Sequence, residues 1–182
     1  MDSKASLQGH PVHPMLVAFP VASYVFTFAA LVGFAATRDP FWYRASMVVN
    51  LVGVVTAVLA AIPGIIDLVS VVPAGTTARR TGSMHAIAHV NALVLFGINL
   101  AMSLRLSAAG KPPVLSVALI LTGAGVLLTA AGGYFGWRLV QRHHIGVAAV
   151  ADLEPHVARS WMEGASTDDE NTRSTAELRP RQ

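Results

Sequence analysis

Long uninterrupted runs of apolar residues dominate the pattern along this chain. Four runs of about 20 residues or slightly more cover residues 15–36, 45–66, 85–104 and 114–137. A helix of this length crosses the hydrocarbon core of a bilayer. A membrane β-barrel would instead require many short segments of alternating polarity. The pattern therefore predicts an all-α integral membrane four-helix bundle.

Polar segments lie on both sides of this predicted membrane domain, which covers residues 15–147. Residues 1–14 form an interfacial segment with the His- and Pro-containing sequence GHPVHP. Residues 148–182 are polar and contain too few large apolar side chains to form a core, so we expect them to be disordered. An amphipathic helix around Val157 and Trp161, lying on the membrane surface, is the alternative for part of this tail.

The loops between the runs predict how the helices alternate across the membrane. The N-terminus, the second loop and the C-terminus fall on one side, and the first and third loops fall on the other. Lys and Arg residues near the runs are split almost evenly, with a small excess on the side of the termini. The positive-inside rule therefore favours cytoplasmic termini.

Composition narrows the chemistry that this bundle can carry. Apolar residues make up 53% of the chain and charged residues 13%, and there is no cysteine. The lack of cysteine excludes disulfides, cysteine-ligated iron–sulfur clusters and covalent attachment of c-type haem within the chain. The formal net charge is +3, but the basic residues are spread over the loops rather than gathered on one face, so no nucleic acid is expected as a partner. The expected partner is the lipid bilayer.

Six histidines and one aspartate near the runs all fall at one predicted membrane face. They are His10, His13, Asp67, His85, His89, His143 and His144. Asp67 directly follows the second run, and a carboxylate at this depth is costly unless it is paired, hydrated or bound to a ligand. His85 and His89 are four residues apart, which places both imidazoles on one helix face. The pattern indicates a His/Asp cluster at this face.

This cluster favours a non-enzymatic, redox-associated membrane protein that binds haem b or a divalent transition metal ion. Haem would use His13, His85, His89 or His143 from facing helices, and a metal ion would use His10, His13, Asp67, His85 and His89. A structural or partner-binding membrane subunit without a cofactor is the alternative. A transporter or proton pathway is the third hypothesis, argued from Asp67, the prolines within the runs and the histidines.

No catalytic motif accompanies these residues. The chain has no nucleophile beside a base and no phosphate-binding loop, and the spacing of His85 and His89 lacks the glutamate of a zinc-protease helix. We therefore do not expect an enzyme. Pro20 and Pro63 predict kinks near the histidines, and Gly132 and Gly136 predict close helix packing.

Three segments together carry a family resemblance: GHPVHPMLVAFP, GIIDLVSVVPAGTTARRTGSMHAIAHVN and GGYFGWRLVQRHHIGV. In this order, from about Gly9 to Val147, the chain resembles the bacterial membrane family called domain of unknown function 2231. The resemblance implies a multi-pass protein of the bacterial inner membrane. Some relatives are joined to Rieske-type iron–sulfur domains, which implies redox partner proteins.

The family pattern falls on many residues of the cluster. The matching positions are His10, Pro11, His13, Pro14, Asp67, Arg79, Arg80, His85 and His143. Two positions depart from it: relatives often have histidine at the position of Ala18, and usually asparagine at the position of His89. The resemblance therefore implies a site like that of the family, with one candidate ligand lost and another gained.

Overall fold

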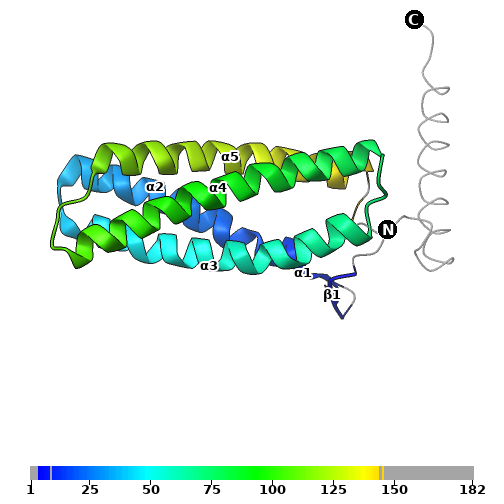
Figure 1. The fold of residues 1–182 in the computed structure, drawn as a ribbon, viewed down its shortest axis with the longest axis horizontal. Coiled ribbons are helices and arrows are strands. Elements are labelled where there is room, and N and C mark those ends of the chain that lie inside the picture. Colours follow the sequence, from blue (N-terminus) through cyan, green and yellow to red (C-terminus); the bar gives the residue numbers. More distant parts are fainter. Residues whose placement is uncertain (1–3, 9, 144, 146–182) are drawn as a thin grey trace, which may run out of the picture. The chain divides into compact units, whose positions relative to one another are not determined.

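The computed structural model describes residues 4–8, 10–143 and 145. Its elements are the strands β1 (Ser6–Leu7) and β2 (His10–Pro11), the short helix α1 (Val12–Leu16), and the long helices α2 (Ala18–Thr37), α3 (Pro40–Ser70), α4 (Thr77–Ala108) and α5 (Leu115–His143) (Figure 1). The four long helices, with α1 joined to α2, are long and apolar enough to cross a membrane. The predicted all-α four-helix bundle is confirmed. The predicted tail at 148–182 lies outside the described residues.

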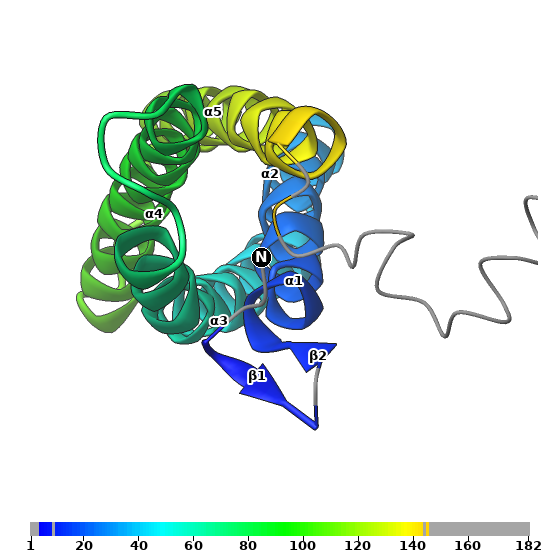
Figure 2. The same ribbon diagram turned by 90° about the vertical axis from the view of Figure 1, so that its right-hand side faces the viewer.

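The four long helices surround a common axis in the order α2, α3, α4, α5, with α5 next to α2 (Figure 2). The antiparallel hairpin of β1 and β2, the connection between α3 and α4, and the last turn of α5 lie at one end of the bundle (Figure 1). We call this the histidine end. The connections between α2 and α3 and between α4 and α5 lie at the opposite end.

Side chains and special backbone conformations fix the helix ends. The Asp39 carboxylate accepts the amide of Phe41 at 2.8 Å, and Pro40 occupies the first helical position of α3, where its missing amide hydrogen costs nothing. Thr76 caps α4 in the same way through the amide of Arg79. At the end of α2, Arg38 adopts a left-handed conformation with φ of 58° and stops the helix.

Pro20 and Pro63, from which kinks were predicted, act differently. Three residues before Pro20 the helix is interrupted at Val17, which separates α1 from α2. Pro63 lies inside α3, which continues through it to Ser70. Proline supplies no amide hydrogen, so this turn of α3 has a weakened set of internal hydrogen bonds. The carbonyl of Ala60, on this turn, accepts a hydrogen bond from His13, which lies outside α3.

Apolar side chains face outward and many polar side chains face the bundle axis. Ile120 and Leu127 are 69% and 72% exposed, as suits side chains that meet lipid. The buried polar residues are Ser23, Thr27, Ser46, Asn50, Thr81, Asn99, Ser103, Thr122 and Thr129. Small polar residues let helices approach closely and satisfy their hydroxyls on nearby carbonyls, as Thr27 does on Ser23 and Thr122 does on Ala118.

Aromatic and imidazole rings of α4 lie directly against glycines of α5. A Cβ atom built on Gly125 would lie 2.6 Å from the Phe96 ring, and one on Gly132 would lie 2.5 Å from His89. His89 lies seven residues before Phe96 on α4, and Gly132 lies seven residues after Gly125 on α5. The two helices therefore keep one antiparallel register, in which each large ring on α4 requires a missing side chain on α5.

Candidate functional site

Three of the predicted histidines form a continuous row inside the histidine end of the bundle. The ring centres of His13, on α1, and His85, on α4, are 5.9 Å apart with an interplanar angle of 83°. The ring of His89, one turn further along α4, lies 4.6 Å from that of His85. All three side chains are half-buried. We call these three residues the histidine row.

Backbone carbonyls orient two of the three rings. Nδ1 of His13 contacts the carbonyl oxygen of Ala60 at 2.7 Å, and Nδ1 of His85 contacts the carbonyl oxygen of Gly132 at 2.8 Å. A carbonyl only accepts, so each Nδ1 carries the hydrogen in these bonds. In the neutral imidazole the lone pair is then on Nε2. This is the arrangement that outer-shell carbonyls impose on histidines that bind metals.

Glycines provide the space that the histidine row occupies. A Cβ atom at Gly64 of α3 would lie 2.7 Å from Nδ1 of His13, and one at Gly136 of α5 would lie 3.0 Å from Nδ1 of His85. His89 lies against Gly132 in the same way. Gly132 and Gly136, predicted as helix-packing residues, therefore serve the packing by receiving imidazoles. The two glycines are four residues apart, as are His85 and His89. This equal spacing was the feature of the sequence from which the contacts between histidines and glycines could have been predicted.

The remaining members of the predicted cluster lie at the same end of the bundle, in other surroundings. Asp67 accepts hydrogen bonds from the amides of Lys4, at 3.0 Å, and Ala5, at 3.2 Å, so it anchors the N-terminal segment. His10 is exposed in the hairpin, where its Nδ1 lies 3.1 Å from the carbonyl of Gln8. Nε2 of His143 lies 3.4 Å from the hydroxyl of Thr81. His144 is outside the described residues.

Arg79, in the first turn of α4, connects α4 to the end of α3. Its guanidinium donates to the carbonyl of Leu68 and, at 3.2 Å, to the carbonyl of Val72. Leu68 lies in the last turn of α3, where carbonyls lack partners within the helix, and Val72 follows the end of α3 at Ser70. The family resemblance drew attention to Arg79, but its role in capping α3 was not visible in the sequence.

A metal site with several protein ligands is not formed in the part of the chain that the structure describes. Among residues 4–8, 10–143 and 145, no group of three or more His, Cys, Asp or Glu side chains is placed to hold a metal ion. The predicted metal set of His10, His13, Asp67, His85 and His89 is thus divided between the histidine row, the hairpin and the anchor of the N-terminal segment. What the histidine row offers is pairs of imidazoles.

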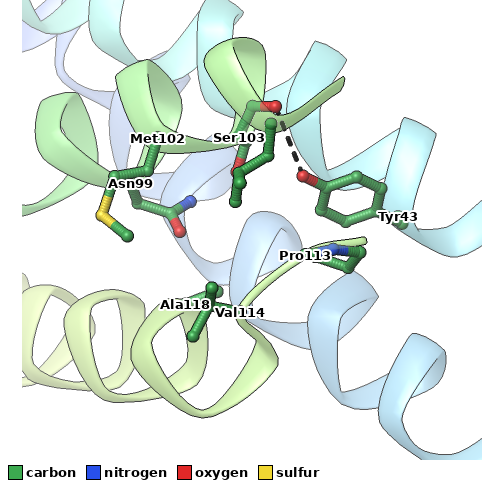
Figure 3. Close-up of a pocket in the computed structure, with 8 residues that line it drawn as sticks. Tyr43, Asn99, Met102, Ser103, Pro113, Val114 and Ala118 are labelled. Carbon is green, nitrogen blue, oxygen red and sulfur yellow. Dashed lines mark hydrogen bonds between the residues drawn. The ribbon is translucent and has the colours of Figure 1, made fainter. Parts of the chain in front are cut away.

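A second polar feature lies at the opposite end of the bundle. A small pocket is lined by Tyr43, Asn99, Met102, Ser103, Leu106, Pro113, Val114 and Ala118 (Figure 3). The Tyr43 hydroxyl donates a long hydrogen bond of 3.4 Å to the carbonyl of Ser103 across the pocket wall. Asn99 and Ser103 continue the inward-facing side of α4 that carries His85 and His89 at the other end.

The fold and this row of inward-facing imidazoles define a multi-pass membrane protein with a polar bundle interior. Comparison with curated proteins and with solved structures finds no match. A family model described as "Predicted membrane protein (DUF2231)" matches residues 9–149. The chain belongs to this family, as its three sequence segments predicted.

Proposed function

We propose that the histidine row binds a transition metal ion between two imidazoles, and that the protein serves a non-enzymatic, redox-associated role in the membrane. The observation that carries this proposal is the pair of carbonyl bonds that direct the hydrogens of His13 and His85 to Nδ1. Both Nε2 lone pairs are thereby kept available for a ligand. Imidazole nitrogen is a good ligand for copper, zinc and iron.

The spacing of the two rings agrees with a shared ion. With a metal–nitrogen bond of about 2 Å, the centre of a bound imidazole lies about 3 Å from the metal. Two ring centres up to about 6 Å apart can therefore share one ion, and those of His13 and His85 are 5.9 Å apart. His89, at 4.6 Å from His85, is the third candidate ligand. The iron of haem b also needs two axial imidazoles, so haem is the other form that such a centre can take.

Absorption spectra and elemental analysis of the detergent-purified full chain test the proposal. We expect about one equivalent of copper, zinc or iron per chain, and we expect it to fall at least severalfold in His85→Ala. His10→Ala is the matched control, because His10 is exposed in the hairpin. A sharp reduced-minus-oxidised band would identify haem. Metal-free protein without such a band, after purification and after reloading with each ion, would exclude the proposal.

A structural role for the same histidines is the second candidate function, and a specific observation favours it. Each carbonyl bond joins two helices: His13 connects α1 to α3, and His85 connects α4 to α5. Interhelical hydrogen bonds of this kind contribute about 1 kcal/mol in membranes. If the role is structural alone, His85→Gln, which retains a donor, should restore the stability lost in His85→Ala, with no metal in any variant.

We also propose a location and an orientation for the protein. The family match supports a membrane protein, and the sequence resemblance supports the bacterial inner membrane. The small excess of basic residues on the side of the termini favours a cytoplasmic histidine end. A redox partner protein would then approach from the cytoplasm. Labelling of single cysteines placed in the β1–β2 hairpin and in the α2–α3 connection, with a membrane-impermeant reagent on intact cells, distinguishes the two orientations.

A further inference from the structure

We propose that the bundle interior is a proton pathway that joins the histidine end to the pocket at the opposite end, with the Tyr24 hydroxyl as its central relay. This activity is separate from metal binding by the histidine row. It is inferred from the buried polar side chains along the axis, from two buried polar atoms that make no hydrogen bond within the described residues, and from the pocket in which the polar side chains end.

The inward-facing side of α4 carries polar groups at both ends of its membrane-spanning stretch, with the buried apolar residues Ala92 and Phe96 between them. At 1.5 Å per residue, the stretch of helix from His85 to Ser103 is about 27 Å long, close to the hydrocarbon core of about 30 Å. Between these ends the buried polar residues of the other helices surround the same axis: Ser23, Thr27, Ser46, Asn50, Thr122 and Thr129. We call this set, with Tyr24, His85, His89, Asn99 and Ser103, the polar column.

Hydroxyls in the polar column retain the capacity to accept hydrogen bonds. Thr27, Thr122 and Thr129 each donate to the carbonyl four residues earlier in their own helix. A hydroxyl that donates once still has two lone pairs. These side chains can therefore accept hydrogen bonds from water molecules along the axis, as a chain of proton transfers requires.

Two side chains in the middle of the column are buried with unmet hydrogen-bonding capacity. The hydroxyl of Tyr24 and Oδ1 of Asn50 make no hydrogen bond within the described part of the chain, although these residues are only 3% and 1% exposed. Leaving such groups unpaired in an apolar interior is costly. Bound water bridging them to the polar column would satisfy both, since buried water typically bonds to polar groups of this kind.

The packing around Tyr24 explains why the proposed cargo is the proton. The Tyr24 ring stacks on that of Phe96, with centres 3.8 Å apart and an interplanar angle of 2°. Behind these rings, Cβ atoms at Gly53 and Gly125 would lie 3.0 Å from Tyr24 and 2.6 Å from Phe96. The two stacked rings therefore fill this layer of the bundle and block hydrated ions. A hydroxyl in this layer can still accept a proton from one side and release another to the other side.

Protons enter and leave the polar column at its two ends, where the column meets water. At one end, the column reaches the half-buried side chains of His85 and His89 at the histidine end of the bundle. At the other end, Asn99 and Ser103 line the pocket beside the α4–α5 connection (Figure 3). Each proton accepted at one end is matched by one released at the other, so no bond changes overall. The flux follows the proton gradient and needs no co-reactant.

Proton flux into vesicles tests the pathway directly. The full chain, freed of metal with a chelator, is reconstituted into liposomes that enclose a pH-sensitive dye, and a potassium diffusion potential is applied with valinomycin. We expect wild-type flux above that of empty vesicles and a flux about tenfold lower in Tyr24→Phe, the effect of removing one hydrogen-bonded link. Tyr24→Phe keeps the stacked ring, so the bundle should fold.

Tyr134→Phe is the matched control, because it makes the same chemical change on an exposed side chain of α5. It should leave the flux unchanged. Wild-type flux no higher than that of empty vesicles, or equal flux in Tyr24→Phe and wild type, overturns the pathway. The metal content of Tyr24→Phe is measured on the same preparation. Loss of flux with normal metal content separates the pathway from the proposed metal site, and either proposal can fail without the other.

Discussion

The imidazole of His89 lies against the backbone of Gly132, so closely that a Cβ atom on this glycine would be 2.5 Å from Nε2 of His89. The carbonyl of Gly132 also accepts the hydrogen bond from Nδ1 of His85. One residue of α5 therefore positions two of the three imidazoles. Its side chain must be absent for the first contact, and its carbonyl must be accessible for the second.

Gly132→Ala is therefore expected to destabilise the bundle and displace both imidazoles. The added methyl group has no space, because the His89 ring is confined between helices, and overpacking of this kind costs about 1–3 kcal/mol. We expect a lower free energy of unfolding in detergent, together with changed NMR signals of both ring nitrogens.

Gly133→Ala is the control for that substitution. Gly133 is exposed, and a Cβ atom there would meet no atom of the described residues within 4 Å. The better helix propensity of alanine should make this variant neutral or more stable by up to about 1 kcal/mol. If the two variants have the same stability, the close contact of His89 with Gly132 does not exist in the protein.

Arg79→Ala is expected to loosen the connection between α3 and α4. The guanidinium donates to the carbonyls of Leu68 and Val72, and hydrogen bonds to charged groups contribute about 1.5–3 kcal/mol. Amides at the end of α3 should exchange hydrogen faster in this variant. Arg80→Ala removes the same charge from an exposed neighbour and should leave exchange unchanged. Equal exchange in both variants would assign the effect to charge alone.

The sequence was sufficient to predict the four helices and the end of the bundle at which the histidines gather. Long apolar runs fix helices in a membrane because lipid offers no partner for backbone groups, and alternation of the helices then brings His13, His85 and His143 to one end. The three family segments were also sufficient for the family assignment. These features depend on hydropathy and spacing, which a sequence displays directly.

The partners of the polar side chains were not predictable, because they depend on helix rotation and register. Asp67 was expected to join the histidines as a ligand, and it accepts the amides of Lys4 and Ala5. The polar residues from which a transporter or proton pathway was argued were expected at one face only. Buried Asn50 and Thr122 extend them along the axis. Single Asn and Thr residues inside apolar runs gave no signal of which side faces inward.

Asp67→Ala is expected to release the N-terminal segment from the bundle. The carboxylate accepts two backbone amides from a segment more than sixty residues away in the sequence, at 3.0 and 3.2 Å. Without it, the amides of Lys4 and Ala5 should lose protection from hydrogen exchange, and a protease should cut this segment faster. Asp39→Ala is the control, since it removes a carboxylate that caps α3 at the opposite end. Unchanged protection in Asp67→Ala would show that the hairpin is held by other contacts.

Gly64→Ala separates the position of His13 from its chemical identity. A Cβ atom at Gly64 would lie 2.7 Å from Nδ1 of His13, which is the atom that donates to the carbonyl of Ala60. The imidazole must therefore move, and the bond at 2.7 Å should weaken or break although every candidate ligand is still present. If metal is bound between His13 and His85, its affinity should fall by about 10–100-fold, the usual effect of disturbing an outer-shell partner. Metal titration of this variant measures the change.

Gly97→Ala is the matched control within the same bundle, because a Cβ atom at Gly97 would meet nothing within 4 Å in the part of the chain that the structure describes. It should leave metal affinity unchanged. Because Gly64 contributes no ligand atom, a loss of affinity confined to Gly64→Ala can act only through the position of His13. Equal affinity in both variants would mean that His13 either is not a ligand or does not need its bond to Ala60. If His13 is not a ligand, His85 and His89 would be the pair of imidazoles that holds the metal.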